Sequence, residues 1–484
     1  MKTNIRTTKR ILSIVLIFFF ISIVPVSQLV HATKDDDVLK LSDKDSITIA
    51  LKNSKDLKKM NLALSSMNRK LISLKKLSDE MDKALKALDE YQILYSKEKK
   101  MLNSSSKDKF QEYLNLQKEI FEISQDNKIN QNEKKRRIQE IQYQLSILNF
   151  TEDESKLLMT TKETSQLFAY KIMFKKLGID NPYISDREKF EKFIKPRDFF
   201  WYSMEAEIKK TRNKKSQLKN TIELSTIKSF NVLYQLNQMV KIKEDIYNIQ
   251  NKDFKQTCIK FKNGQVSRLE RDCVERELKK CALDLENTKR NKDNMEMNFK
   301  KLLGISLYKN IEIINKTDTA KLSLDKEDYL KNAIKNRAEI LNDNIDIDVK
   351  KRELSIIKKY LASKDIEWIE GENSVCQAEI KLNNSKNLIE KDILSSYIEI
   401  ENYKNKLEMS HKTLNNAKEK LKDVNKTHEV GMSTLLATLK AKLYVTQCEI
   451  ESIKSNLDYQ ESLYKIKFAS EIGYINKGGF TNEK

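Results

Sequence analysis

The chain is 484 residues long, with 8 glycines, 3 prolines and a third of its residues charged. Few helix breakers and many helix formers predict long helices with thin apolar seams, and exclude one thick globular core. The formal net charge of +20 suits anionic partners such as cell-wall polymers or lipid headgroups, although interspersed Lys and Glu also suit solvated helix faces.

The N-terminal segment 1–32 has the pattern of a secretory signal peptide. A basic head precedes the apolar run Ile11 to Val24, and Val30-His31-Ala32 fits a cleavage site. The apolar run is shorter than the roughly 20 residues that a membrane-spanning helix needs. We therefore expect an exported, extracytoplasmic protein of the cell envelope, with an uncleaved anchor as the alternative. Export also argues against nucleic acid as a partner.

A short motif opens each half of the chain. Residues 41–57 predict a helix with Ser42 as its N-cap and Asp45 in the first turn. The motif returns at residues 324–340, where each matching residue number is higher by 283. We assign residues 33–70 and 320–374 to these opening helices.

The first half carries an additional segment, which we place at residues 71–212 and expect to be helical. Asn103-Ser104-Ser105-Ser106 interrupts one helix, and capping-box patterns at Thr151 and Ser185 begin others. Four aromatic residues at 199–202 follow Pro196. They predict a packed corner, or a docking patch if they are exposed.

A heptad pattern occurs twice, with matching residue numbers that differ by 167, and each copy ends at a lone glycine, Gly264 or Gly431. An apolar period of about 3.5 residues is typical of helices packed side by side as a coiled coil. We therefore predict an all-α fold with two tandem long helical hairpins, at residues 213–310 and 375–474, that reverse at these glycines. The inward positions are Ile389, Ile393, Ser396, Ile400, Tyr403, Leu407, Ser410, Leu414, Ala417, Leu421 and Val424, and upstream Ile222, Thr226, Ser229, Leu233, Leu236, Val240, Lys243, Tyr247, Gln250, Phe254 and Thr257.

No catalytic motif, cofactor-binding loop or metal-ligand spacing is present, so we expect neither an enzyme nor a cofactor or metal site. His411 and His428 lie far from any cysteine in the sequence. The five cysteines are an odd number and form no closed disulfide framework. Cys258 and Cys273 flank Gly264 and could approach each other across the hairpin, while buried thiols are the alternative.

Several stretches in a fixed order resemble the TolC family of outer-membrane efflux proteins. Besides the two opening motifs, they include the segment that closes the first half at Gly304, NFKKLLG. The two segments that resemble the hairpin tips of that family are FKQTCIKFKNGQVSRLERD and NKTHEVGMSTLLATLKAKL.

The resemblance implies that three protomers, each with two hairpins, close into a hollow helical tunnel. In that family the hairpin tips meet a membrane-fusion adaptor or a pump. The implied partner-binding residues of the first tip are Phe261, Gly264, Ser267 and Glu270, and those of the second are His428, Gly431 and Ser433. His428 replaces an aromatic residue at the second tip, and Ala437 stands where the first tip has Glu270.

The chain departs from the family where membrane strands would lie. In the second half, only the short stretch 364–375 is expected between helices, too little for a two-stranded membrane hairpin. The sequence therefore predicts a TolC-like helical body, without support for an outer-membrane location. The interpretation is a helical component of an efflux or export system, and the alternative is an exported coiled-coil structural or interaction protein.

Overall fold

The computed structural model describes residues 38–314, 325–363 and 365–475, so the expected signal peptide lies outside the described residues. By internal contacts the chain divides into two units, Met1–Lys40 with Tyr308–Glu312, and Leu41–Leu307 with Ile313–Lys484. In the first unit, the described residues include most of β1 and β2, where Leu39 N–H donates to the Asn310 carbonyl oxygen at 2.9 Å.

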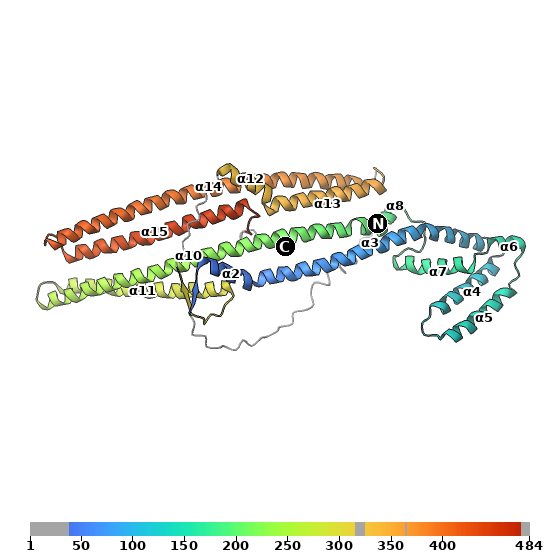
Figure 1. Ribbon diagram of the computed structural model, residues 1–484, viewed down its shortest axis with the longest axis horizontal. Coiled ribbons are helices and arrows are strands. Elements are labelled where there is room, and N and C mark those ends of the chain that lie inside the picture. Colours follow the sequence, from blue (N-terminus) through green and yellow to red (C-terminus); the bar gives the residue numbers. More distant parts are fainter. Residues whose placement is uncertain (1–37, 315–324, 364, 476–484) are drawn as a thin grey trace. The chain divides into compact units, whose positions relative to one another are not determined.

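Long helices make up almost all of the described chain (Figure 1). In chain order the elements are β1 (Leu39–Leu41), α2 (Asp43–Asn53), α3 (Lys55–Leu102), α4 (Lys107–Gln125), α5 (Gln131–Ile147), α6 (Glu152–Leu157), α7 (Thr161–Lys176), α8 (Asp186–Lys189), the π-helical turn η2 (Phe190–Ile194), α9 (Lys195–Asp198), α10 (Phe200–Lys262), α11 (Arg268–Leu303), β2 (Ile311–Ile313), α12 (Lys326–Asn336), α13 (Ala338–Tyr360), α14 (Ile366–Glu429) and α15 (Leu435–Ser470).

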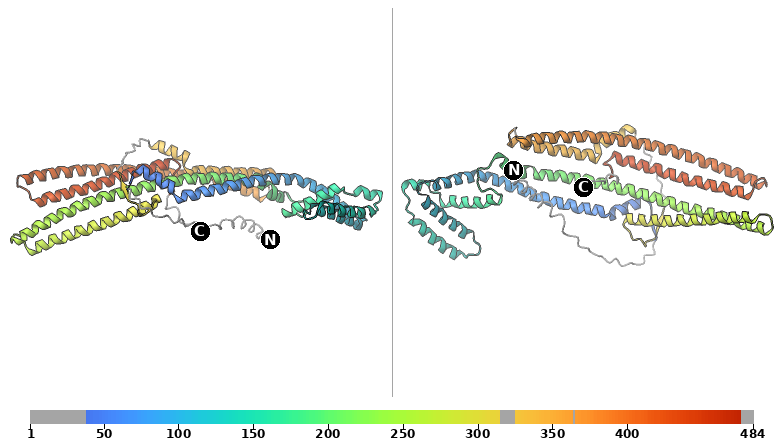
Figure 2. Two further views of the ribbon diagram at one scale, coloured as in Figure 1. Left: turned by 60° about the horizontal axis from the view of Figure 1, so that its bottom comes forward. Right: turned by 180° about the vertical axis from the view of Figure 1, so that it is seen from behind.

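The two predicted hairpins are confirmed, and they are copies of each other. The first consists of α10 and α11 and the second of α14 and α15. The helix ends on both sides of the turns, and the far ends of both return arms, carry residue numbers that differ by 167. α10 has 63 residues and is therefore about 95 Å long. The two hairpins can be followed in Figures 1 and 2 as two pairs of antiparallel helices.

The predicted heptad positions form the inner seams of these hairpins, and none of them is fully exposed. In the second hairpin, Ala417 packs against Val445 and Cys448, and Leu414 and Leu421 lie beside this cluster. In the first hairpin, Phe230 contacts the buried Phe299 of α11 edge to face, with ring centroids 6.3 Å apart. Helices of this length are not stable on helix propensity alone, and apolar contacts at this spacing keep them folded.

Each half closes by packing its opening helix against the end of its return arm. In the first half, Asn53 at the end of α2 donates through Nδ2 to the Leu303 carbonyl oxygen at 3.0 Å. Gly304, with φ +65°, caps α11 at this contact. In the second half, Arg337 follows α12 and donates to the Ala469 carbonyl oxygen at 3.3 Å and to Asp392 at 2.9 Å. The duplicated motif therefore has a duplicated packing role.

The structure corrects the sequence prediction in two places. The short strands β1 and β2 pair with each other, although no strand was predicted. α14 begins at Ile366, so most of the expected connection at residues 364–375 is helical. Gly371 lies within α14, and a Cβ there would lie 2.9 Å from Leu354 Cδ1, at the end of a side chain of α13.

The additional helices of the first half lie between α3 and α10, where the second half has only the short connection between α13 and α14. α3 ends at Leu102, as the polar run at residues 103–106 predicted, and it is continuous across residue 71. α10 is likewise continuous across residue 212. The limits proposed for this segment, 71–212, stay a prediction. We call residues 103–199 the helical insert.

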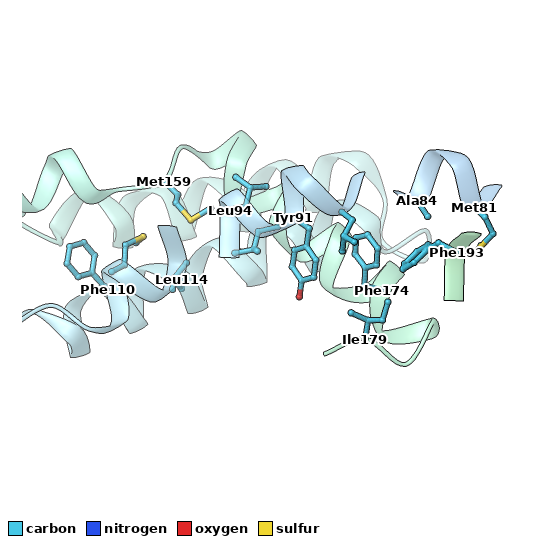
Figure 3. Packing of buried hydrophobic residues seen from close by; sticks show 13 residues of the cluster. Met81, Ala84, Tyr91, Leu94, Phe110, Leu114, Met159, Phe174, Ile179 and Phe193 are labelled. Carbon is cyan, nitrogen blue, oxygen red and sulfur yellow. The ribbon is translucent and has the colours of Figure 1, made fainter. Parts of the chain in front are cut away.

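The helical insert packs against the C-terminal half of α3 in one apolar core (Figure 3). Tyr91 of α3 stacks on Phe174 of α7, with centroids 5.1 Å apart and planes 6° apart. Phe110 of α4 is fully buried in the same cluster. At the other end of the helical insert, Phe199 packs in a cluster with Ile356 and Leu361, so the predicted aromatic corner is packed and not a free patch.

One acidic side chain ties the start of α6 to α4. The Glu154 carboxylate accepts hydrogen bonds from the Ser106 hydroxyl, from Thr151 N–H at 2.8 Å and from Lys109 Nζ at 3.1 Å. These interactions lower the pKa of Glu154 to about 2, and the hydrogen bond from Ser106 has the largest effect. Because the pKa of Glu154 is lower in the folded state, its charged carboxylate stabilises the fold at pH values above the ordinary pKa of a glutamate. This stabilisation is lost as the pH falls through about 2.

We expect Glu154→Gln to destabilise the helical insert at neutral pH, and the deficit relative to wild type to shrink between about pH 5 and pH 2. Urea unfolding at several pH values measures this difference. Glu152→Gln is the matched control, because Glu152 lies in the same first turn with a nearly fully exposed side chain. A deficit that stays constant over the whole pH range would show that the Glu154 charge is not the cause.

Candidate functional site: the hairpin tips

Both hairpins reverse through the same backbone motif. At the first tip, Gly264 N–H donates to the Phe261 carbonyl oxygen at 3.0 Å, and Gln265 N–H to that of Lys260 at 2.8 Å. At the second tip, Gly431 and Met432 repeat this pattern at 3.0 and 2.8 Å. This pair of bonds is the Schellman motif, which needs a left-handed residue. Gly264 and Gly431 supply it, with φ values of +69° and +76°.

The first tip is polar and basic. The Arg271 guanidinium lies over the Phe261 ring at 4.8 Å and also pairs with Asp272. That hydrogen bond from Arg271 lowers the pKa of Asp272. Ser267 caps α11 by accepting from Glu270 N–H at 3.1 Å, which places the Glu270 carboxylate in the first turn, where the helix dipole favours negative charge.

The second tip uses different side chains for the same turn. His428 Nδ1 lies 2.9 Å from the Ser433 carbonyl oxygen; because a carbonyl only accepts, Nδ1 carries the proton. Ser433 does not cap α15. Thr434 does, by accepting from Ala437 N–H at 3.2 Å. Thr434 was missed by the sequence interpretation, although the internal repeat places it directly on Ser267.

The two tips differ most in what they expose. Val430 and Met432, on either side of Gly431, are 70% and 82% exposed. The residues at the same places of the first tip are the polar and exposed Asn263 and Gln265. The second tip therefore exposes two large apolar side chains at a short turn. The sequence shows two large apolar residues beside the turn glycine, and this pattern could have indicated an exposed apolar surface at the second tip.

Within the described residues, no cluster of three His, Cys, Asp or Glu is placed to hold a metal ion. All five cysteines are free thiols, including Cys258 and Cys273 beside the first tip. None of the helices in the described ranges has the length and apolar character needed to cross a bilayer.

The tip glycines should tolerate a side chain at a modest cost. A Cβ at Gly264 or Gly431 would have no atom within 4 Å. Gly264→Val and Gly431→Val should therefore lower the free energy of unfolding by about 1–2 kcal/mol each, the cost of a left-handed conformation. Circular dichroism should show unchanged helix content, because both residues lie outside the helices. Loss of a large fraction of the helical signal would contradict this account.

Comparisons with known proteins find similarity among solved structures. No protein-family model matches the sequence, and no curated protein matches it. The chain is similar to the outer membrane protein VceC from Vibrio cholerae at 11% identity and a TM-score of 0.46, over 57% of this chain and 75% of VceC. For the Campylobacter jejuni CmeC outer membrane channel, the identity is 14% and the TM-score 0.45, over 58% of this chain and 69% of CmeC.

Proposed function

We propose that this protein is a TolC-like helical component of an extracytoplasmic efflux or export system, and that it works as a homotrimer. The observation that carries the proposal is the duplication of a long hairpin whose tip residues are largely exposed. Four long helices per protomer suffice to form one sector of a ring. Each tip exposes side chains that are not needed to form its turn, such as that of Met432.

Assembly is the first test of this proposal. Light scattering over a wide range of concentrations should give three times the protomer mass, and electron microscopy of the purified protein should show rings with a central opening. Particles that remain monomers at all concentrations would contradict a tunnel built from several copies.

Partner docking is the second test. We propose that the tips bind a membrane-fusion adaptor or pump through Phe261, Gly264, Ser267 and Glu270, and through His428, Gly431 and Ser433. A photo-crosslinking residue at Met432 should capture an envelope membrane protein in cells. The same residue at Lys440, exposed on the flank of α15, is the control. Gly264→Val and Gly431→Val should reduce capture from Met432. Identical products from positions 432 and 440 would contradict tip docking.

The helical insert favours the second candidate function, an exported structural or interaction protein. Its core of stacked aromatic side chains is separate from the hairpin seams. A deletion of residues 103–199 distinguishes the two functions if the hairpins remain helical. The conduit function predicts that trimers persist without the helical insert, and the interaction function predicts that envelope partners are lost.

An anionic cell-wall polymer is a further proposed partner, at the basic face of α10. Residues 209–219 contain six Lys and Arg and no acidic residue. We expect Ala substitutions at Lys209, Arg212, Lys215 and Lys219 to weaken binding of poly(glycerol phosphate) roughly tenfold, and the remaining binding to depend less on salt. The control substitutes Lys418, Lys420 and Lys422, which are exposed on α14. Equal binding by both variants would contradict the assignment.

A further inference from the structure

A cavity lies where the second half of the chain closes against α10. Its volume is about 440 Å³, which is enough for a small organic molecule. Residues of α10, α13 and α14 line it, together with the segment that follows α15. Three carboxylates and three basic groups face it, so the cavity carries charges of both signs. These residues are Glu207, Glu339, Asp392, Lys210, Lys214 and Arg337.

Arg337 holds two carboxylates together at one end of the cavity. Its side chain is 10% exposed, and its guanidinium donates to both carboxylate oxygens of Glu339 at 3.1 Å and to Asp392 Oδ2 at 2.9 Å. The two carboxylates themselves are about half exposed. Two negative charges share one positive charge, so this end of the cavity is acidic and its carboxylate oxygens can accept hydrogen bonds from a ligand.

The internal repeat shows that closure of the fold does not require these charges. The residues of the first half at the positions of Arg337 and Asp392 are Ser54 and Ser225. Ser54 caps α3 by accepting from Leu57 N–H at 3.2 Å. A buried arginine between carboxylates contributes little net stability, because its desolvation offsets the attraction. The charged group is therefore an addition in the second half, and binding of a ligand gives a reason for it.

α10 and α13 run antiparallel along the cavity, which fixes the levels of its charges. Asn213 of α10 donates through Nδ2 to the Asn342 side-chain oxygen at 2.9 Å, and Lys210 forms an ion pair with Asp346. Arg337 lies five residues before Asn342. Its level is therefore about four residues, roughly 6 Å, beyond Asn213 along the axis of α10.

Lys214 provides a positive charge on the α10 wall that is not yet paired. It is exposed, and it forms no ion pair with any residue in the part of the chain that the structure describes. Its level differs from that of Arg337 by about 4.5 Å along the helix axis. Lys210 differs from it, because Lys210 pairs with Asp346 and also lies 3.8 Å from Glu207. The cavity thus offers an acidic end and, about one helical turn away, a separate cation.

We propose that this cavity binds a small zwitterion of the size of a dipeptide, with its ammonium group at Asp392 and Glu339 and its carboxylate at Lys214. A dipeptide is at most about 7 Å long, which suits charges offset by one helical turn. The amide of Gln217 and the ring of Tyr474, which also line the cavity, can bind the peptide group and a side chain. A ligand with a single charge would meet the wrong sign at one of the two places. The inference does not depend on the proposed oligomer or on tip docking.

Calorimetric titration of the full-length protein with alanylalanine tests the ligand class. We expect a dissociation constant of roughly 1 mM, because the cavity is partly open and its charged groups stay partly hydrated. N-acetyl-alanylalanine lacks the ammonium group and alanylalanine amide lacks the carboxylate, so each should bind at least roughly tenfold more weakly. Equal binding by either blocked peptide would overturn the proposal, and so would the absence of binding by alanylalanine at about 10 mM.

Substitutions locate the two charges of the ligand. Lys214→Gln should weaken binding of alanylalanine roughly tenfold and remove the preference for alanylalanine over its amide, because it removes the partner of the carboxylate. Lys209→Gln is the matched control, since Lys209 is exposed on the same helix and does not line the cavity. Asp392→Asn should weaken binding of both peptides that carry a free ammonium group.

Lys214→Gln decides the test on its own if Asp392→Asn disturbs the fold, because Lys214 is exposed while Asp392 is a partner of the buried Arg337. Circular dichroism of each variant shows whether the helices are intact. A preference for alanylalanine over its amide that survives Lys214→Gln would overturn the proposal. Equal weakening by Lys209→Gln would show that the net charge of α10, and not the cavity, attracts the peptide.

Discussion

Replacing Phe174 with Ala is expected to unfold the helical insert selectively. Phe174 is fully buried and packs against Tyr91, with Tyr170 and Phe193 at centroid distances of 6.3 and 6.1 Å. Truncation of a buried Phe to Ala removes apolar contacts and leaves a cavity, at a cost of about 3–5 kcal/mol. Amide hydrogen exchange in α4 and α7 should then become on the order of a hundred to a few thousand times faster.

The same substitution should leave the distant hairpin unaffected, because Phe174 belongs to the core around α3, α4 and α7 and not to the hairpin seams. Hydrogen exchange in α14 and α15 measured on the same sample provides this comparison. Ile172→Ala is the matched control on α7, since Ile172 is half exposed. Equal acceleration in α15 would show that the helical insert and the hairpins unfold as one cooperative unit.

The hairpins were predictable because local chemistry defines their ends. A glycine after an apolar helical run, followed closely by a hydroxyl residue, gives the Schellman turn and the next N-cap without help from distant residues. At the second tip, two adjacent hydroxyl residues follow Gly431. The length of the turn selects Thr434 over Ser433 as the cap, and only the internal repeat carries that information.

Features that depend on distant packing were not predictable in the same way. β1 and β2 are short strands from opposite ends of the first half, too short to show an alternating pattern. Gly371 lies inside α14 beside Leu354 of α13, although glycine is unfavourable in a helix interior.

Gly304→Val is expected to destabilise the protein by about 2–5 kcal/mol, more than valine at either tip glycine. All three glycines have φ between +65° and +76°. Valine at any of the three positions therefore has the same conformational cost of about 1–2 kcal/mol. At Gly304 a Cβ would lie 2.9 Å from Asn53 Cβ, at the contact that closes the first half. Forcing a side chain into such a packed contact costs about 1–3 kcal/mol more.

Urea unfolding of the three valine variants side by side separates these two costs, because Gly264 and Gly431 provide the same backbone conformation in open space. Adding Asn53→Gly to Gly304→Val removes the clashing atom and should recover part of the loss, which a double-mutant cycle measures directly. If all three valine variants lose the same stability, the close approach of α2 to the end of α11 is not what requires glycine at position 304.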